Sequence, residues 1–307
     1  MISNNILTEL EKKIKKDKIT SCLIQREDTL VFEYYKNSKM KDKQHKVNSV
    51  TKSVLSILVG IAIDRGDLEG VHQPISDFFP NLTDLQNQLT IEHLLTMTSG
   101  LDWPEFTNWG GRPMPMINSR DWVQFILERP MVEAPGENMN YNSGCSHLVS
   151  AILQMATGQP LTGYADSYLF KPLGIKDYIW YSDAKGIVIG GFGLTLKAED
   201  MLKIGQLMLH EGDWNGQRVV SKDWVKESTK PRFHPYNKIG SYGYHWWILT
   251  DEDRQPAQPP VYFAMGYGGQ YIIVAPENQL IVTFTSDLYN DTFKPLKYFK
   301  DIIVCHH

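Results

Sequence analysis

The chain is organised around one apolar stretch that opens with a serine, Ser49-Val-Thr-Lys52-Ser-Val-Leu-Ser-Ile-Leu-Val-Gly-Ile-Ala-Ile-Asp64. Val, Leu and Ile occupy positions nearly all around the helical turn rather than one stripe, which is typical of a fully buried helix. Gly66 follows directly and is a common helix terminator. We therefore expect a core helix that opens at Ser49 and ends at Gly66.

Short β-rich runs lie on both sides of this helix, near the two ends of the chain. Residues 19–23 and 29–35 flank a turn at Arg26-Glu-Asp, which predicts a hairpin. Four later runs are separated by turn residues, at 242–249, 261–265, 271–275 and 280–285. Strands at both ends predict one antiparallel sheet that uses both termini.

The segments between these strands show helical patterns broken by Pro and Gly. The expected helices cover residues 91–97, 122–127, 146–156, 161–169 and 198–210, with further ones at 9–18 and 295–304. The fold class predicted is therefore α/β (α+β), an antiparallel sheet flanked by helices with a mainly helical inserted region. Residues 1–66 and 200–307 are assigned to the sheet domain and 67–199 to the helical region, together one catalytic unit.

The composition is that of an ordinary folded protein. The chain has 307 residues, 42% of them hydrophobic and 21% charged, with a formal net charge of -4. This mild acidity argues against a nucleic-acid partner, and the lysines between Lys36 and Lys46 are interpreted as a solvated loop. No apolar run approaches 18 residues, so no membrane partner is expected.

The cysteines and the first residues bear on location. Cys22, Cys145 and Cys305 are an odd number spread over the whole length, which is not a disulfide framework. The start of the chain lacks a basic segment followed by an apolar run, so no signal peptide is recognised. We expect a reducing, cytoplasmic setting.

Common catalytic signatures are missing from the sequence. It contains no Gly-x-Ser-x-Gly elbow, no His-Glu-x-x-His and no Cys-x-x-Cys, so neither a metal nor a cofactor is expected. What remains is Ser-x-x-Lys, found at Ser38/Lys41, Ser49/Lys52 and Ser182/Lys185. Only the pair at Ser49 opens a strongly apolar helix.

The spacing of Ser49 and Lys52 has a chemical consequence. Residues three apart share a helix face, so the Lys52 amine can reach the Ser49 hydroxyl. Burial of the lysine would lower its pKa and let it accept a proton. The N–H groups of the first helical turn would face the negative charge that develops in acyl transfer. The alternative is that Ser49 only caps the helix and Lys52 is a surface charge.

Two further segments contain residues that could take part in acyl transfer. Tyr141 lies in Pro135-Gly-Glu-Asn-Met-Asn-Tyr-Asn-Ser143, where a phenol near ammonium groups can act as a general base, or can be an ordinary half-buried side chain. The run Tyr262-Phe-Ala-Met-Gly-Tyr267-Gly-Gly-Gln270 is a strand interrupted by glycines. An unpaired strand-edge N–H there could stabilise an oxyanion, and the alternative is a Gly-rich bulge.

The order Ser-x-x-Lys, Tyr-x-Ser and Gly-rich strand resembles the serine hydrolases related to class C β-lactamases and penicillin-binding proteins. Within them it is similar to the esterase and 6-aminohexanoate-dimer hydrolase branch. Leu94-Leu-Thr-Met-Thr-Ser-Gly-Leu101, Gly190-Gly-Phe-Gly-Leu-Thr-Leu196 and Tyr242-Gly-Tyr-His-Trp-Trp247 extend the likeness over nearly the whole chain. The resemblance implies a β-lactamase/transpeptidase-like fold with its site in a cleft.

The resemblance also implies roles for individual residues. Ser49 would be the acylated nucleophile, Lys52 the proton relay and Tyr141 the general base. Ser143 stands where many relatives carry Asn and would hydrogen-bond in the site. The second oxyanion donor would be the N–H of Tyr267, next to Gly266.

The chain departs from the pattern at the strand that carries Lys-Thr-Gly in penicillin-recognising relatives. We align that triplet with Ala264-Met-Gly266 and discount competing triplets that begin at Lys203, His210 and Lys238. Ala264 cannot pair with a substrate carboxylate, so a substrate with an uncharged end is expected. Arg112, Lys238 or His245 could supply a charge from elsewhere.

These interpretations lead to one function. We expect a cofactor-independent serine hydrolase that cleaves a small-molecule ester or amide through an acyl-enzyme on Ser49, with homodimer formation left open. The alternatives are a β-lactamase or D-Ala-D-Ala peptidase, or an acyl-binding sensor that does not turn over. An aromatic pocket is expected from the density of rings near the cleft, at Trp103, Phe106, Trp109, Tyr181, Trp246, Trp247 and Tyr267. The alternative is that these rings belong to the core, and at least one of Trp246 and Trp247 is expected there.

Overall fold

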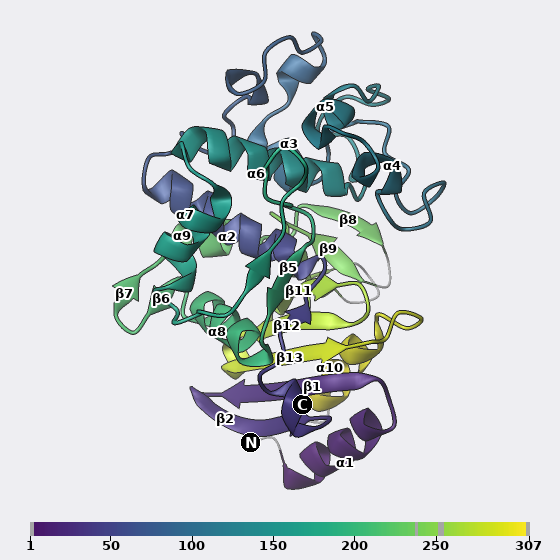
Figure 1. Cartoon of the computed structure of the whole chain (residues 1–307). Coiled ribbons are helices and arrows are strands. Elements are labelled where there is room, and N and C mark those ends of the chain that lie inside the picture. Colours follow the sequence, from purple (N-terminus) through teal and green to yellow (C-terminus); the bar gives the residue numbers. More distant parts are fainter. Residues whose placement is uncertain (1–2, 237–238, 251–254, 305–307) are drawn as a thin grey trace.

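An eight-stranded antiparallel sheet dominates the computed structural model, which describes residues 3–236, 239–250 and 255–304. The order across the sheet is β2-β1-β13-β12-β11-β10-β9-β8. Its strands are β1 Ile19–Arg26, β2 Thr29–Tyr35, β8 Phe233–Tyr236, β9 Gly240–Tyr242, β10 Trp247–Ile248, β11 Tyr262–Gly266, β12 Gln270–Ala275 and β13 Leu280–Ser286. Because β1 pairs with β13, strands from the two ends of the chain lie side by side in one sheet, as predicted (Figure 1).

Helices flank this sheet and fill the region inserted between β2 and β8. They are α1 Asn4–Lys15, α2 Val50–Asp64, α3 Ile91–Leu95, α4 Met114–Ile117, α5 Trp122–Leu127, α6 Ser143–Thr157, α7 Leu161–Ala165, α8 Ala198–Leu209, α9 Lys222–Ser228 and α10 Lys294–Val304. The predicted fold class, an α/β sheet from both chain ends with a mainly helical insertion, is confirmed (Figure 1). The division into 1–66 plus 200–307 and 67–199 stays an expectation.

The two faces of the sheet are covered by different helices. Side chains alternate along each strand, so Ile272 and Val274 belong to the core that holds α2 and α8, while Ile273 faces the opposite way. On that second face the sheet meets Leu10 of α1 and Phe299 of α10 (Figure 1). The sheet is therefore buried on both sides in its centre, which explains the near-continuous apolar runs of β12 and β13.

Helix α2 is the buried helix that the sequence predicts. Every residue from Val50 to Ala62 is buried, and each large aliphatic side chain placed there contributes about 1.5–3 kcal/mol to folding. The ring of Trp224 lies so close to Gly60 that an added Cβ would come within 2.3 Å of it. Helix α2 ends at Asp64, and Gly66 just beyond it has a φ of 78°.

One predicted strand is wrong. The run 242–249 is not continuous, because the chain turns after β9 and returns as β10, with His245 in the turn at a φ of 59°. The N–H of His245 donates to the Leu95 carbonyl, which holds the turn against α3. The turn exists because of this tertiary contact, so the local sequence pattern could not predict it.

Several short elements had no sequence signal. Two small sheets are formed by β3 His45–Lys46, β4 Ile179–Trp180 and β5 Leu194–Leu196, and by β6 Asp213–Trp214 with β7 Gln217–Arg218. Single-turn elements complete the list at Ser38–Met40, Ile75–Asp77, Gln86–Gln88 and Pro276–Asn278. The π-helical turn Asp166–Phe170 is different, because it continues α7 within the helix expected over residues 161–169. Strands of two or three residues are too short to show an alternating pattern.

No helix in the described part of the chain is long and apolar enough to cross a membrane.

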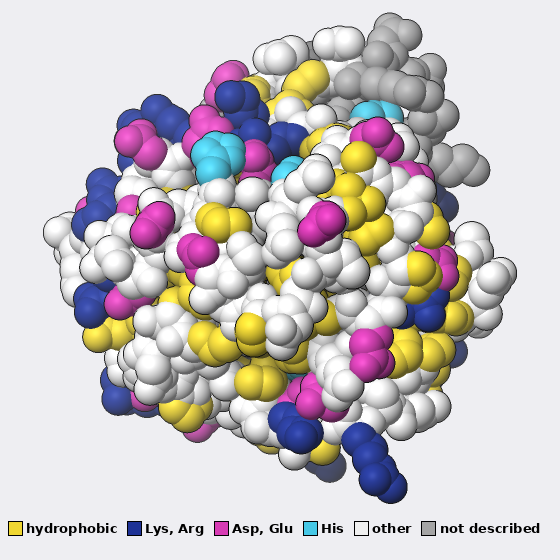
Figure 2. Space-filling model, turned by 90° about the horizontal axis from the view of Figure 1, so that it is seen from above, with side chains coloured by type: hydrophobic (Ala, Val, Ile, Leu, Met, Phe, Trp, Pro, Cys, Tyr) yellow, Lys and Arg dark blue, Asp and Glu magenta, His cyan; other side chains and the backbone are white. Residues whose placement is uncertain are grey.

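Seen from above, acidic and basic side chains are intermixed over the helical region rather than gathered by sign (Figure 2). Lys41, in the lysine-rich loop, lies on the surface and pairs with Glu33 and Glu199.

Candidate active site

Ser49 lies at a sharp turn between β3 and α2. The preceding residue, Asn48, has a φ of 49°, and its carbonyl accepts the Thr51 hydroxyl at 2.6 Å. Ser49 occupies the N-cap position of α2, but its side chain makes no capping hydrogen bond. The hydroxyl is instead the partner of the Lys52 amine, at 3.2 Å. The interpretation of Ser49 as a simple helix cap therefore does not describe this geometry.

Lys52 is almost completely buried, with 1% of its surface exposed. Burial lowers the pKa of its amine to about 8, against an opposing effect from the carboxylate of Glu105. Its Nζ atom lies 3.2 Å from the Ser49 hydroxyl, 3.2 Å from the Ser143 hydroxyl and 2.7 Å from the Gly191 carbonyl. The alternative of a surface charge is excluded by this environment.

Glu105 is a buried carboxylate that no sequence motif pointed to. Its Oε2 accepts the indole N–H of Trp103 at 2.8 Å and the backbone N–H of Ser143 at 2.9 Å. Its Oε1 lies 2.8 Å from the Ser143 hydroxyl. A glutamate in a Pro-flanked loop, Trp103-Pro-Glu105, has no distinguishing spacing, so only the fold brings it to Ser143.

The donors and acceptors around Lys52 leave one arrangement for a neutral amine. With Glu105 as a carboxylate, the Ser143 hydroxyl donates its proton to Glu105 and can only accept from Lys52. The Gly191 carbonyl can also only accept. These two acceptors use both N–H groups of a neutral amine, so its lone pair is directed at the third neighbour, the hydroxyl of Ser49. The surroundings of Lys52 would thus direct the lone pair of a neutral amine toward the Ser49 hydroxyl.

Tyr141 lies on the same cavity as Ser49, with its ring 4.9 Å from the Lys52 Nζ. The ring stacks on Trp247 at 6.4 Å and is flanked by Phe106 at 5.2 Å. It is 7% exposed, so packing fixes its position tightly. The structure thus brings together Ser49, Lys52 and Tyr141, which are far apart in the sequence.

The Gly-rich segment also reaches Ser49, although not as an edge strand. β11 is an interior strand, but β10 pairs only with Tyr262 and Phe263, so the later half of β11 is left open toward α2. A Cβ added to Gly266 would lie 3.2 Å from the Ser49 nitrogen and 2.2 Å from the Val47 carbonyl. Only glycine allows this approach.

Tyr267 follows directly and is held by the turn before α2. The side-chain amide of Asn48 donates to the Tyr267 carbonyl at 2.6 Å. This contact links the turn that carries Ser49 to the end of β11. The backbone N–H groups of Ser49 and Tyr267 are therefore candidates for one oxyanion site.

A cavity of about 610 Å³ opens over Ser49. Its walls are formed by Ser49, Glu105, Phe106, Gly110, Gly111, Arg112, Tyr141, Ile239, Trp247, Met265, Tyr267, Thr292 and Phe293. A second cavity of about 670 Å³ lies in the helical region beside Phe79 and Met155 and touches none of the candidate catalytic residues. Chemistry, rather than size, therefore assigns the site to the first.

Four aromatic residues expected at the cleft do not line it. Trp109 packs edge-on against Trp103 at 4.8 Å, and Trp103 and Trp246 are core residues. Tyr181 is 51% exposed and lies elsewhere on the surface. Phe106, Trp247 and Tyr267 do line the cavity, and Met265, Ile239 and Phe293 add apolar surface that was not predicted.

His245 does not serve as a substrate-binding cation. It is 1% exposed, does not line the cavity, and lies 3.1 Å from the Ser146 hydroxyl through its Nε2. Burial, with Lys52 nearby, lowers its pKa to about 3, so the ring is neutral at ordinary pH. The expectation that it supplies a positive charge is wrong because the turn after β9 points it into the core.

The other residues considered as a source of positive charge lie at different places in the structure. Lys203 pairs with Asp200 on α8, and His210 follows α8 and pairs with Asp28, both outside the cavity. Lys238 lies outside the described residues. Arg112 lines the cavity and is exposed.

The strand position aligned with the missing cation is buried as well. Ala264 belongs to the core with no exposed surface, and its neighbour Met265 is the side chain that faces the cavity. Both Ala264 and Met265 are apolar, so β11 provides no cation to the cavity at either position. Cys145 is also buried, and burial raises its pKa to about 12, which makes it a poor nucleophile.

Comparison with known proteins shows the family to which the chain is similar over most of its length. A family model described as Beta-lactamase matches residues 19–300. The 6-aminohexanoate-dimer hydrolase of Paenarthrobacter ureafaciens is 24% identical over 299 residues, which cover 90% of this chain and 74% of that protein. Esterase EstB of Burkholderia gladioli is 30% identical over 152 residues, 45% of this chain and 38% of EstB.

The fold is found among solved structures too. The class C beta lactamase of Rhodobacter sphaeroides superposes with a TM-score of 0.74 at 16% sequence identity. The match covers 99% of this chain and 99% of that one, so the architecture is shared over the whole length.

Proposed function

The chain belongs to the beta-lactamase family, whose relatives matched above include named hydrolases, and from this premise we propose that it cleaves an ester or amide through an acyl-enzyme on Ser49. The observation that carries the proposal is the buried amine of Lys52, which lies 3.2 Å from the Ser49 hydroxyl with its other two neighbours acting as acceptors. A lysine oriented in this way is a base for the serine proton.

The reaction then proceeds in two halves. The Ser49 oxygen attacks the substrate carbonyl carbon while its proton passes to neutral Lys52. The bond from that carbon to the leaving oxygen or nitrogen breaks, and the leaving group takes the proton, with Tyr141 as the second proton-transfer group in the cavity. Water next attacks the acyl-enzyme and gives its proton to Lys52. When the bond from the carbonyl carbon to the Ser49 oxygen breaks, Lys52 returns this proton to that oxygen, which releases the acid and restores free Ser49 and the neutral amine.

The oxyanion of each tetrahedral intermediate needs two donors. The N–H groups of Ser49 and Tyr267 are the proposed pair, supported by the close approach of Gly266 to the Ser49 nitrogen and by the hydrogen bond from Asn48 to the Tyr267 carbonyl. The positive end of α2, a helix of 15 residues, adds to the stabilisation.

Two alternatives share this apparatus. A β-lactamase or D-Ala-D-Ala peptidase would use the same nucleophile and would need a cation for the substrate carboxylate. β11 provides no such cation, and Arg112 lines the cavity from a different segment. A sensor that is acylated without turnover would show a stoichiometric burst and no steady state. Ester or amide turnover is favoured because the cavity walls are mainly apolar and aromatic.

A panel of substrates tests the proposal. We expect steady-state hydrolysis of p-nitrophenyl acetate and longer p-nitrophenyl esters, weaker cleavage of a linear amide dimer, and little or no turnover of nitrocefin. Intact-mass measurement during turnover should show an acyl group on Ser49. Faster turnover of nitrocefin than of every ester would assign a β-lactamase instead, and a burst without a steady state would assign the sensor.

The position of Arg112 leads us to expect a preference for esters that carry a carboxylate. It is exposed on the cavity wall, and no acidic side chain in the described ranges forms an ion pair with it. An ester whose acyl chain ends in a carboxylate, such as mono-p-nitrophenyl adipate, should exceed p-nitrophenyl hexanoate in kcat/KM by about tenfold, the size of one charge-assisted hydrogen bond. Arg112→Gln should remove this difference and Arg112→Lys keep part of it. Equal loss on both esters would rule out a carboxylate-binding role.

A further inference from the structure

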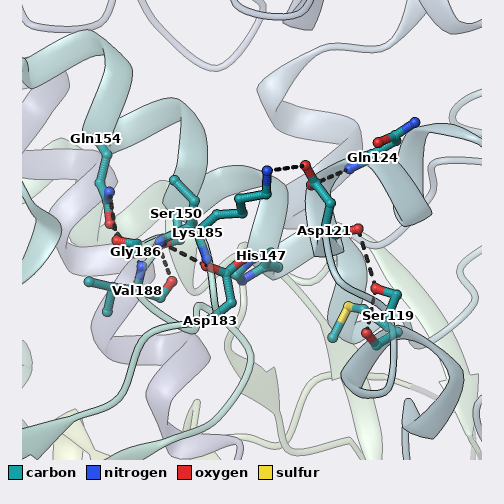
Figure 3. A network of polar contacts seen from close by, with 12 residues as sticks. Ser119, Asp121, Gln124, His147, Ser150, Gln154, Asp183, Lys185, Gly186 and Val188 are labelled. Carbon is teal, nitrogen blue, oxygen red and sulfur yellow. Dashed lines mark hydrogen bonds and ion pairs between the residues drawn. The ribbon is translucent and has the colours of Figure 1, made fainter.

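Helix α6 carries a stripe of polar side chains along one of its faces. Ser143, His147, Ser150 and Gln154 are spaced four, three and four residues apart, which places them in line on a helix. In a helix whose residues are buried from Ser143 to Leu153, polar side chains in line need polar partners. The segment that begins at Asp183 returns along this face and provides partners for His147, Ser150 and Gln154 (Figure 3). The partners of the Ser143 hydroxyl are Glu105 and Lys52.

The segment is fixed to the stripe at several points. The Ser150 hydroxyl donates to the Val188 carbonyl at 2.5 Å, and the Val188 N–H donates to the Gln154 side chain at 2.9 Å (Figure 3). Further along, Gly190 lies so close to α6 that an added Cβ would be 2.0 Å from the Ser146 carbonyl. The position of the segment along the helix is therefore set within narrow limits.

The start of the segment is held by a buried pair of side chains. The Nε2 of His147 lies 3.0 Å from a carboxylate oxygen of Asp183, and each side chain is 1% exposed. The other oxygen of Asp183 accepts the backbone N–H groups of Lys185 and Ile187, both at 2.9 Å (Figure 3). Burial alone would raise the pKa of Asp183, but these hydrogen bonds and His147 lower it below its usual value.

The far end of the segment reaches the catalytic lysine. Three residues after Val188 comes Gly191, whose carbonyl accepts from the Lys52 amine at 2.7 Å. A Cβ added to Gly191 would lie 3.3 Å from the Nζ atom and 3.2 Å from the Cβ of Ser143. Any shift of the segment along α6 would move this carbonyl relative to Lys52.

We propose that the His147–Asp183 pair is a positioning device for Lys52, which acts by fixing the register of residues 183–191 on α6 and hence the place of the Gly191 carbonyl. The inference rests on the proposed role of Lys52 as the base. His147 and Asp183 do not line the cavity over Ser49, so they are positioning and not catalytic residues.

Stability alone is a weak explanation for the pair. Taking a charged or strongly polar pair out of water costs about as much as its interaction returns, and apolar residues of similar volume are often equally stable. In addition, the Nδ1 atom of His147 is buried without a partner in the described part of the chain. What an apolar pair could not do is fix the start of the segment by hydrogen bonds with one defined geometry.

Asp183→Asn tests the proposal most directly. The introduced amide keeps an oxygen for the N–H groups of Lys185 and Ile187. It removes the charge of the carboxylate and places an N–H donor opposite Nε2 of His147, so the present hydrogen bond is lost and His147 keeps a contact there only as the other tautomer. We expect kcat for an ester to fall roughly 10- to 100-fold, with KM changed less than about twofold, because a catalytic group is misplaced while the cavity is intact. Rates are normalised to active sites titrated by acylation of Ser49.

A pH profile separates positioning from simple loss of folded protein. The titratable groups that face Lys52 are Glu105, Cys145, His245 and Tyr141, none of which the substitution changes. Weakening the contact with the Gly191 carbonyl removes an acceptor that stabilises the ammonium form, so the rising limb of kcat/KM should move to lower pH. A purely structural effect would leave the limb where it is.

Two further variants act as controls. Asp121 forms the outer ion pair with Lys185 of the same segment, at 3.7 Å, and caps α5 through the Gln124 N–H. Asp121→Asn is the same chemical change and retains a capping side chain, so kcat and the pH limb should stay within about twofold of the unsubstituted protein. His147→Gln keeps a donor near the position of Nε2 and should retain most of kcat.

Ser150→Ala keeps the proposal testable if Asp183→Asn does not fold. It removes only the hydrogen bond to the Val188 carbonyl, so a few-fold fall in kcat with a limb shift in the same direction is expected. Unchanged kcat and pH limb in whichever variant folds would overturn the positioning role. If the unsubstituted protein formed no acyl adduct on Ser49, the proposed function itself would fail, which is a different result.

Discussion

Replacing Ser49 with alanine should lower ester turnover by about 10,000-fold or more, because loss of the nucleophile removes the acyl-enzyme route altogether. The fold should be unaffected. The Ser49 side chain makes no capping hydrogen bond to α2, and Lys52 keeps its contacts with Ser143 and Gly191. The measurement is kcat/KM for a p-nitrophenyl ester, together with the thermal midpoint and the intact mass after incubation with substrate.

The chain supplies a matched control for this variant. Ser38 is the first residue of another Ser-x-x-Lys sequence, with Lys41, which pairs with Glu33 on the surface. Ser38→Ala should retain full activity and the acyl adduct. Activity of Ser49→Ala near that of the unsubstituted protein, or an adduct on another residue, would contradict the proposed nucleophile.

Most of the scaffold could be predicted from the sequence because its elements are long and their patterns strong. The long apolar run of α2, the β-branched and aromatic runs of β11 to β13 between turn residues, and the amphipathic pattern of α8 are recognisable in the sequence. The choice of Ser49 over Ser38 and Ser182 followed from the same information, since only Ser49 opens a buried helix. Burial of Lys52 was a consequence of that helix, and the structure places it at 1% exposure.

What could not be predicted depends on tertiary contacts between distant segments. Glu105 reaches Ser143 only because a loop folds over α6, and Gly191 reaches Lys52 only because the segment before it is held along α6. The expectation that His245 supplies a positive charge is wrong for the same reason, because the turn that contains it is held by a hydrogen bond to the distant Leu95 carbonyl. Single residues in loops have no periodicity, so their contacts appear only in the folded chain.

The pH dependence of activity should report the protonation of Lys52. Its pKa is lowered to about 8 by burial, so the amine is mostly charged at pH 7 and mostly neutral at pH 9. If the neutral amine is the base, kcat/KM for an ester should rise about tenfold per pH unit below pH 8 and level off above it. The profile is measured from pH 6 to 10, corrected for spontaneous hydrolysis.

Glu105→Gln tests the same assignment through the direction in which the pH profile shifts, which a general loss of activity would not change. The carboxylate of Glu105 raises the pKa of Lys52, so removing its charge should lower that pKa and move the limb toward lower pH. In this variant the Ser143 hydroxyl loses its acceptor, which should lower kcat/KM at every pH. At pH 6.5 a larger neutral fraction of Lys52 partly offsets this loss, whereas at pH 9.5 Lys52 is neutral in both proteins and only the decrease is seen.

Lys52→Ala should abolish the rise of kcat/KM with pH. It should also lower the rate by about 100- to 10,000-fold, the usual contribution of a positioned base. A limb that persists near pH 8 in that variant would belong to another group, with Tyr141 the first to consider since its ring lies 4.9 Å from the amine. A profile that falls through pH 8 instead of rising would mean that Lys52 acts in its charged form, as an electrostatic partner of the oxyanion and not as the base, and a limb that does not move in Glu105→Gln would belong to a group other than Lys52.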